Sequence, residues 1–264
     1  MLGAWQKLEE NCPAGYTLQK IAYGTHEQQE IYLTLPAGKK DFPLIIWFHG
    51  GGLTGDEWQY PSELWNGEYG AAIIRHRTSG GPFNALDSLA DSVEATAWVL
   101  AHLAEIGAAP EKVFLGGLSA GGWLSAMIGM NPELLAKYGF DNKCFAGLLL
   151  VSGQMTTHFQ LKKDLGYNST DYEPVIDQYA PIRYASKDLP PVILITGAPG
   201  MDMPGRPEEN AFMAATLRAL GHTDAEHFAL PGHDHFASFC SCDLLLLRFM
   251  DRILNNNDGR SHYE

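Results

Sequence analysis

A serine set among glycines is the feature of this sequence that most clearly suggests chemistry. Ser119 lies in the stretch VFLGGLSAGGWLS, residues 113–125, between an apolar run and a helix-like pattern. A sharp strand-to-helix turn forces its central residue into a strained backbone, which is tolerated when the residues two before and two after it lack a Cβ atom. Gly117 and Gly121 hold those two positions. The pattern indicates a nucleophilic serine, and a glycine-rich helix start that serves only packing is the alternative.

A nucleophilic serine needs a base to take its proton and a carboxylate to orient that base. Late in the chain, HDHF offers His233 and His235. Asp202 lies in the loop after the apolar run PPVILITG, and the next acid along the chain is Glu208. The order serine, aspartate, histidine, each after a successive late apolar run, fits this requirement. In a loop rich in Pro and Gly, Asp202 as a simple turn former is the alternative.

A glycine loop, HGGG at residues 49–52, follows an earlier apolar run. Its bare backbone can turn N–H groups toward a neighbouring site, where they would hold the oxyanion of a tetrahedral intermediate. His49 is expected to be structural and to fix the loop by hydrogen bonding. Leu53 follows the loop and is a candidate for lining a substrate pocket. Three aromatic residues beyond it either line an acyl or alcohol pocket or pack at its rim: Trp58, Tyr60 and Trp65.

An alternating pattern of elements is available to position these groups. Short apolar runs such as PLIIWFHG, GAAIIRHR, KVFLGG, CFAGLLLVSG, PPVILITG and EHFALPG alternate with helical stretches, of which residues 86–107 and 207–221 are the clearest. This alternation predicts an α/β fold with a mostly parallel sheet and helices on both faces. Residues 16–24 and 30–36 predict an antiparallel hairpin at the sheet edge. In parallel sheets, reactive groups collect at the carboxyl ends of the strands.

The chain is predicted to form one domain over residues 1–264, because 45% hydrophobic content allows a large core. Residues 154–185 interrupt the alternation with polar and aromatic residues, which predicts a lid-like insertion. The tail from residue 255 is predicted to be frayed.

The formal net charge of −13 argues against binding to nucleic acid or to anionic membrane surfaces. No apolar run approaches the roughly 20 residues of a membrane helix. The N-terminal residues show no secretory signal pattern, so a soluble cytoplasmic protein is expected. The four scattered cysteines are expected to be free thiols, with Cys240 and Cys242 buried.

No metal or other cofactor is expected. His233, Asp234 and His235 are adjacent in sequence and lack the spacing and the third ligand of a zinc site.

With these motifs in place, the chain resembles the α/β hydrolases. HGGG and GLSAGG are similar to the motifs of the hormone-sensitive-lipase-like and the acetyl-xylan or feruloyl esterase-like carboxylesterases, and the resemblance runs from Tyr23 to about Phe249. It implies an α/β-hydrolase fold with a small lid insertion. It also implies that Ser119 is the nucleophile, Asp202 the acid and His235 the base.

The same resemblance makes the N–H groups of Gly51, Gly52 and Ala120 the oxyanion donors. One departure concerns the acid. The family commonly places it two or three residues after the strand-ending glycine, whereas Asp202 comes five residues after Gly197, so Glu208 stays as a fallback.

His235 is preferred to His233 because residues i and i+2 of an extended loop point in opposite directions, so only one can face the serine. In the family pattern DHF, the base directly precedes an aromatic residue that packs under the sheet edge. Phe236 holds that position and is a further candidate for the substrate pocket. His233 is then expected to hydrogen-bond at the surface or to shape the pocket rim.

The function implied by these residues and by the resemblance is that of a serine carboxylesterase acting on small acyl esters, with acylated sugars among the candidate substrates. An amidase or arylformamidase would use the same triad. A catalytically inactive binding homologue is the alternative from another class.

Overall fold

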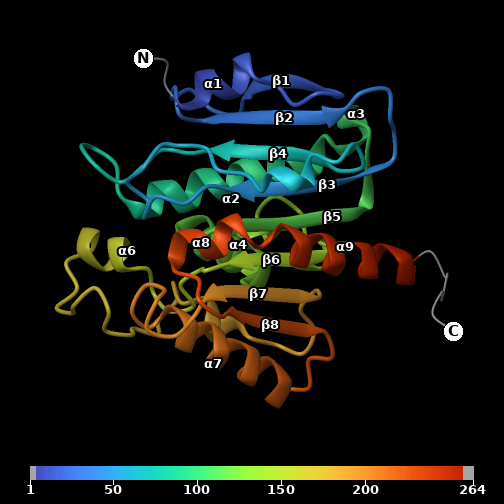
Figure 1. Cartoon of the computed structure of the whole chain (residues 1–264). Helices are drawn as coiled ribbons and strands as arrows, with labels where there is room; N and C mark the ends of the chain where they lie inside the picture. Colours follow the sequence, from blue (N-terminus) through green and yellow to red (C-terminus); the bar gives the residue numbers. More distant parts are fainter. Residues whose placement is uncertain (1–3, 258–264) are drawn as a thin grey trace, which may run out of the picture.

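The computed structural model describes residues 4–257, and an eight-stranded sheet runs through the centre of the molecule (Figure 1). The strands are β1 (Tyr16–Ala22), β2 (Glu30–Pro36), β3 (Phe42–Phe48), β4 (Gly70–Arg75), β5 (Ala108–Leu118), β6 (Gly147–Val151), β7 (Val192–Gly197) and β8 (Ala225–Leu230). Their spatial order is β1-β2-β4-β3-β5-β6-β7-β8. Strand β2 is antiparallel to both β1 and β4, and all other pairs are parallel. Both the predicted hairpin and the mostly parallel sheet are therefore confirmed.

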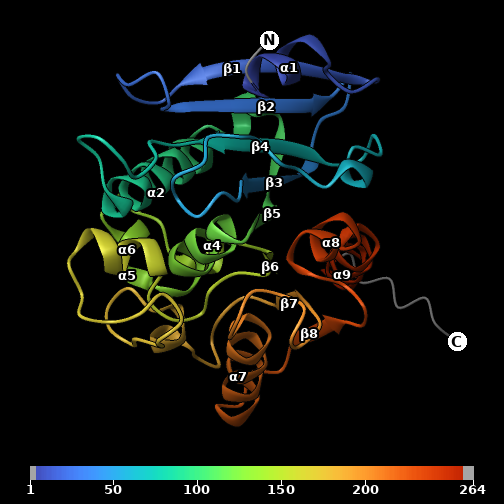
Figure 2. The same cartoon turned by 60° about the vertical axis from the view of Figure 1, so that its left-hand side comes forward.

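Helices cover both faces of the sheet (Figure 2). They are α1 (Ala4–Glu10), α2 (Ala85–Ala101), α3 (Leu103–Ile106), α4 (Ala120–Met130), α5 (Pro132–Ala136), α6 (Phe159–Asp164), α7 (Arg206–Ala219), α8 (His235–Cys240) and α9 (Asp243–Asn257). Short 3-10 helices are η1 (Ser62–Leu64), η2 (Asn142–Cys144) and η3 (Pro181–Tyr184). None of the helices within residues 4–257 combines the length and the hydrophobicity that a membrane crossing needs.

Two hydrophobic layers result from this arrangement. Side chains of α2, α4 and α7 pack with one face of the sheet, and those of α1 and α9 pack with the other. Alternation along β5 serves both layers: Val113 and Leu115 point to the first and Phe114 to the second, and all three are fully buried. Each such side chain stabilises the fold by about 1.5–3 kcal/mol relative to exposure.

The helix predicted over residues 86–107 is interrupted at one residue. Helix α2 begins with a capping box, in which Asn84 accepts from the Leu86 N–H and Asp87 accepts from the Asn84 N–H, and it ends before His102. The His102 ring nitrogen contacts the Trp98 carbonyl at 2.7 Å, and α3 follows. Gly107 then ends the segment in the left-handed conformation (φ 84°), at the residue where the predicted helix also ends.

The ends of the chain differ from the sequence-based expectations in two details. Helix α9 continues to Asn257, so the first residues of the tail predicted to be frayed are helical, and residues 258–264 lie outside the described part of the chain. Of the two cysteines expected to be buried, Cys242 is buried but Cys240 is exposed, because it lies at the solvent-facing end of the short helix α8.

The insertion at residues 154–185 is held by a buried lysine. Lys162 of α6 is 2% exposed, and its ammonium group donates to the carbonyl oxygens of Thr170 (2.7 Å), Asp171 (3.3 Å) and Glu173 (2.6 Å). Asp164, at the end of α6, accepts from the Ser79 hydroxyl and the Ala85 N–H, both at 2.7 Å. The insertion is thus fastened internally and to the start of α2.

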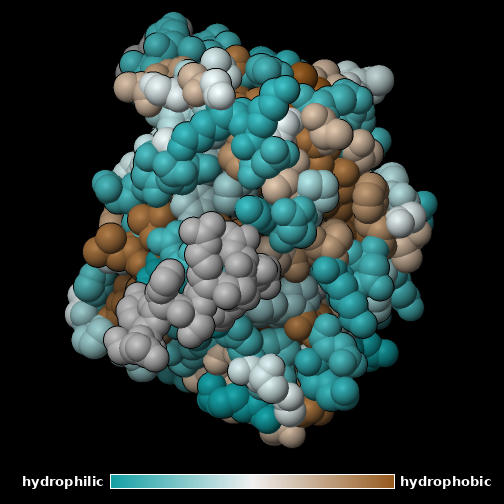
Figure 3. Space-filling view, turned by 90° about the vertical axis from the view of Figure 1, so that its right-hand side faces the viewer, coloured by the Kyte–Doolittle hydropathy of each residue, from teal (hydrophilic) through white to brown (hydrophobic). Residues whose placement is uncertain are grey.

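The arrowheads of β4 and β7 in Figure 1 point to the side of the molecule on which α6 lies. The carboxyl ends of the parallel strands therefore meet beside the insertion. The opposite edge, seen in Figure 3, presents mainly hydrophilic residues with hydrophobic ones interspersed.

Candidate active site

Ser119 forms the turn between β5 and α4. Its backbone has φ 55° and ψ −113°, and its N–H donates to the Val151 carbonyl at 2.8 Å. A Cβ atom at Gly117 would lie 2.5 Å from the backbone of Gly121, and one at Gly121 would lie 2.1 Å from the Phe48 carbonyl oxygen. The glycines thus permit a close approach of backbone to backbone, which fixes the strained serine at the strand end.

A line of hydrogen bonds joins the three residues predicted to form the triad. The Ser119 hydroxyl lies 2.9 Å from His235 Nε2, and His235 Nδ1 lies 2.6 Å from Asp202 Oδ1. The Asp202 side chain is fully buried, whereas 27% of the His235 side chain is exposed. This geometry suits transfer of the serine proton to the imidazole, with the carboxylate fixing the tautomer.

Asp202 reaches His235 because the loop after β7 folds back on itself. The Asp202 N–H donates to the Ala198 carbonyl at 3.0 Å, and the carboxylate accepts from the N–H groups of Gly197 (2.7 Å) and Met203 (2.6 Å). Burial opposes ionisation of the carboxyl group, but hydrogen bonds from His235, Ser152 and Gly197 outweigh it and lower the pKa of Asp202 to about 2.

Glu208, the fallback acid, lies exposed in the first turn of α7. The extra residues between Gly197 and Asp202 are therefore taken up by a compact turn, and the structure brings Asp202 rather than Glu208 to the histidine.

His235 is the first residue of helix α8. Asp234 caps this helix by accepting from the Ala237 N–H at 2.8 Å. The choice between the two histidines assumed an extended loop. That assumption is wrong, because the chain becomes helical at His235. His233 is half-buried, its Nε2 lies 3.1 Å from the Ser241 hydroxyl, and its ring makes no hydrogen bond to the triad residues in the described structure.

The glycine loop lies against the start of α4. A Cβ atom on Gly121 would lie 2.6 Å from the His49 carbonyl oxygen, and Gly51 and Gly52 both have positive φ (104° and 64°). Within residues 4–257, the N–H groups of Gly51, Gly52 and Ala120 have no hydrogen-bond acceptor. N–H groups without an acceptor can hold an oxyanion, so these three remain candidates for that role.

The buried side chain of His49 supports the glycine loop. It is fully buried, and its Nδ1 lies 2.7 Å from the Gly50 carbonyl oxygen. Burial, with the neighbouring His76 as a further contribution, lowers the pKa of His49 to about 3, so the ring is neutral. The ring stacks on that of His76 with 4.8 Å between centroids.

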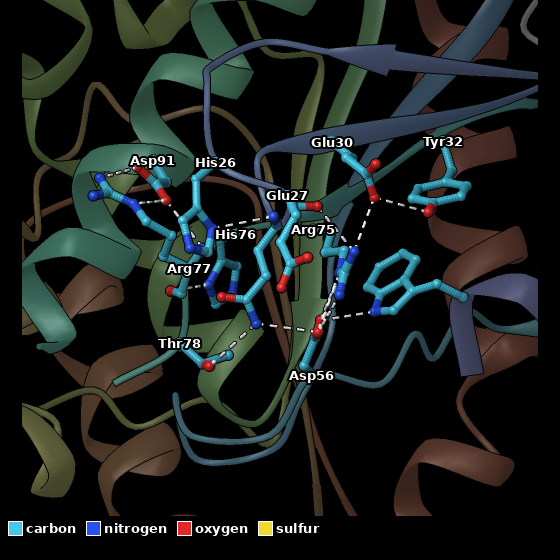
Figure 4. Close-up of polar contacts among 12 residues, drawn as sticks. His26, Glu27, Glu30, Tyr32, Asp56, Arg75, His76, Arg77, Thr78 and Asp91 are labelled. Atoms are coloured by element: carbon cyan, nitrogen blue, oxygen red, sulfur yellow. Dashed lines mark hydrogen bonds and ion pairs between the residues drawn. The ribbon is translucent and has the colours of Figure 1, made fainter. Parts of the chain in front are cut away.

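A polar network fastens the chain just after the glycine loop (Figure 4). The carboxylate of Asp56 accepts from Arg75 Nε at 2.9 Å and also from Arg75 Nη2. It accepts as well from the Trp5 ring N–H (2.7 Å) and from Gln28 (3.1 Å). Burial opposes ionisation of Asp56, but hydrogen bonds led by that from Arg75 lower its pKa to about 2. The loop is thereby joined to the end of β4 and to the N-terminal segment.

The residues predicted to line a pocket have different surroundings. Leu53 is 1% exposed within the core, and its carbonyl accepts from the Ser79 N–H at 2.6 Å. Phe236 is 65% exposed, so its predicted packing under the sheet edge is wrong: the helical start of α8 turns it to solvent. Trp58 packs against the second hydrophobic layer, with its ring 6.0 Å from that of Trp65.

Tyr60 is buried in that layer, and its ring meets that of Trp47 edge to face at 5.8 Å. Of the two roles considered for these aromatic residues, packing is the one seen for Tyr60.

Two residues at this site were missed by the sequence analysis. Ser152 follows β6 and touches both Asp202 and His235. Phe159 of α6 lies beside the glycine loop, with its Cζ atom 3.2 Å from a Cβ atom built on Gly52. The run LLLVSG did place a serine at a strand end, where reactive groups collect, and this signal could have identified Ser152.

Among the described residues, no group of three or more His, Cys, Asp or Glu side chains is arranged to hold a metal ion. The residues that gather at this site are those of acid–base and nucleophilic chemistry.

Residues 30–156 match the BD-FAE family model. No curated protein sequence matches the chain. Among solved structures, native esterase Est2 from Thermogutta terrifontis is 22% identical with a TM-score of 0.71, and the match covers 94% of this chain and 95% of that one. The same esterase also matches, with a TM-score of 0.69 in each case, as structures with butyrate bound, with propionate bound and phosphorylated by paraoxon.

Two further solved structures have the same fold. Esterase B from Lactobacillus rhamnosis is 19% identical with a TM-score of 0.74, covering 97% of this chain and 96% of that one. A bifunctional GH43-CE protein from Bacteroides eggerthii is 19% identical with a TM-score of 0.74 over 89% of this chain and 35% of that one. The likeness to the two esterases covers nearly the whole chain.

Proposed function

We propose that this chain, which has the α/β-hydrolase fold, is a serine carboxylesterase that cleaves small acyl esters through Ser119, His235 and Asp202. The observation that carries the proposal is the line of hydrogen bonds from the Ser119 hydroxyl through His235 to Asp202, at 2.9 and 2.6 Å. The match to the BD-FAE family model and the esterase neighbours support the same reaction class.

In this mechanism the Ser119 Oγ atom attacks the ester carbonyl carbon while His235 Nε2 takes the hydroxyl proton. The oxyanion is held by the N–H groups of Gly51, Gly52 and Ala120. The protonated imidazole, stabilised by Asp202, then gives its proton to the leaving alcohol, and an acyl-enzyme remains. Water activated by His235 attacks that acyl group, which releases the acid and restores the serine.

Short acyl groups are the proposed substrates. Phe159 lies against Gly52 and narrows the space beside the oxyanion donors. The Thermogutta esterase has been solved with butyrate and with propionate bound, which supports a short acyl chain for a site of this architecture. Acylated sugars, whose ester groups are equally small, belong to this substrate class.

The test combines covalent labelling with a substrate panel. The parent chain should react with a fluorophosphonate probe, and Ser119→Ala should abolish labelling while the melting temperature stays within a few degrees. Among p-nitrophenyl esters of rising chain length, acetylated sugars and N-formyl aromatic compounds, short-chain esters should give the highest kcat/KM. Retained labelling in Ser119→Ala, or a preference for long chains at an oil interface, would refute the proposal. A preference for the N-formyl compounds would make the chain an amidase instead.

A further inference from the structure

Ser152 touches two of the three proposed triad residues without being one of them. We infer that Ser152 is a positioning residue, whose hydroxyl holds the carboxylate of Asp202 in the orientation that His235 requires. The inference rests on the proposed function in that it concerns the same site.

The hydroxyl of Ser152 lies between the acid and the base. It donates to Asp202 Oδ2 at 2.5 Å, and its oxygen is 3.2 Å from His235 Nδ1. Asp202 Oδ1 meets the same Nδ1 at 2.6 Å, so three polar groups form a closed triangle. Each carboxylate oxygen of Asp202 therefore has a defined partner, with the Gly197 N–H as the second donor to Oδ2.

The backbone of Ser152 is fixed on both sides. The residue is fully buried and adopts φ 48°, a left-handed conformation that is uncommon for a residue with a side chain. Its N–H donates to the Ile195 carbonyl at 2.7 Å, and its carbonyl accepts from Arg206 Nη1. A strained non-glycine residue that is held this firmly is typical of functional sites.

The hydroxyl matters because the terminal torsion of an aspartate is soft and has no strongly preferred angle. Without Ser152, Asp202 Oδ2 would keep only the Gly197 N–H and Oδ1, besides His235, only the Met203 N–H, so the carboxylate would stay beside His235 but its angle to the ring would be less firmly set. The hydroxyl also withdraws charge from Asp202, so its removal leaves a carboxylate that binds the protonated imidazole more strongly.

Other charged and titratable groups near this triangle come from two elements. Arg206 and Glu209 of α7 interact electrostatically with each other, and Arg206 also acts on Asp202. His158, just before α6, is fully buried and interacts electrostatically with Arg206. None of these three groups hydrogen-bonds to the triad residues within the described structure, so the hydroxyl of Ser152 is the side-chain contact to remove.

The test uses Ser152→Ala and Ser152→Gly in the full chain. Both remove the hydroxyl, whereas glycine also relieves the left-handed backbone, so an effect shared by the two belongs to the hydroxyl. We expect kcat to fall about tenfold with KM within about twofold, since a misplaced general base slows the chemical step. The acidic limb of the pH profile of kcat/KM should move to higher pH, and the downfield NMR signal of the His235 Nδ1 proton should change position.

Ser92→Ala is the matched control, because Ser92 is also fully buried and donates one hydrogen bond, to the Ser88 carbonyl at 2.7 Å. It should alter none of these three measurements. If Ser152→Ala and Ser152→Gly change only the melting temperature, the inference is wrong. Should the parent chain cleave no ester and take no probe, the proposed function fails, while the NMR signal still decides the role of Ser152.

Discussion

Arg75 holds the carboxylate of Asp56 through two nitrogen atoms, Nε at 2.9 Å from Oδ1 and Nη2 on Oδ2. Asp56 follows the glycine loop by four residues, and Arg75 ends β4. This two-pronged ion pair joins the end of β4 to the chain just after the glycine loop. It fixes both the distance and the relative orientation of the two segments.

Asp56→Asn should lower kcat about tenfold with KM within about twofold, because donors that are out of place fail to stabilise the transition state. Steady-state kinetics on a short p-nitrophenyl ester measures both constants. Asp224→Asn is the control: it breaks a similar pair with Arg252 (2.9 and 2.6 Å) at the start of β8, away from the carboxyl ends of the strands. Equal losses in both variants would show a general effect on folding instead.

His235→Ala should reduce kcat by about three orders of magnitude or more, as loss of a triad base does. His233→Ala should change it by about tenfold or less, because His233 contacts Ser241 and the Pro231 carbonyl at the surface. Single-turnover or steady-state rates of the two variants decide the matter. A larger loss in His233→Ala would mean that the loop before α8 is arranged differently in the working enzyme.

Asp202→Asn should lower kcat by roughly three to four orders of magnitude, since the amide no longer fixes the imidazole tautomer. Glu208→Gln removes the fallback acid, which is exposed in α7, and should leave kcat within about twofold. Both variants are compared by kcat at pH 8, with circular dichroism as the check on folding. Comparable activity of Asp202→Asn and the parent would remove Asp202 from the mechanism.

Acid should destabilise the fold well before the carboxylates titrate. Burial lowers the pKa values of His49 (to about 3), His76 and His158, so these rings bind fewer protons in the folded chain than in the unfolded chain. In the unfolded chain they take up protons below about pH 6.5. Their contribution to stability is complete above that pH and declines as the pH falls toward their folded pKa values, with an uptake of up to about three protons. Urea unfolding at pH 7, 6 and 5 measures the slope, and a free energy of unfolding that is constant over this range would contradict the prediction.

Gly121→Ala should cost about 3 kcal/mol or more, or prevent folding, because the added Cβ atom would lie 2.1 Å from the Phe48 carbonyl oxygen. Gly139→Ala is the comparison variant. At that position φ is 82° and an added Cβ atom meets nothing within 4 Å, so only backbone strain of about 1 kcal/mol is expected. Chemical denaturation of both variants gives the difference. Similar losses would show that close approach at the serine turn is unimportant.

The strands and the longer helices of this fold can be predicted from local sequence patterns. The candidate active site can be predicted only in part. Apolar runs bounded by glycine or histidine predict the central strands because a strand buried on both faces has few polar positions. The constraint at Ser119 was also accessible, since only the lack of a Cβ atom at Gly117 and Gly121 explains two glycines in those places. Asp202 and the pair His233 and His235 follow from the positions of strand ends along the chain, and the resemblance to the hydrolases favours His235 of the two.

What could not be predicted depends on contacts between distant segments. The sequence places Ser152 at a strand end, but its contact with Asp202, 50 residues later in the chain, forms only when β6 and β7 pair. Helix α8 has six residues, too few for a periodic pattern, and its start at His235 turns Phe236 outward. Cys240 is exposed for the same reason, because it is the last residue of this short helix.

Lys162 supplies the insertion with a cation from within the chain itself. Three carbonyl oxygens of residues 170–173 converge on its ammonium group, a kind of coordination for which many loops recruit calcium from solution. Here the cation is covalently attached to the loop that needs it, so it cannot be diluted away, exchanged for another ion or extracted by a chelator. The convergence of these carbonyl groups at residues 170–173 therefore requires no bound metal ion.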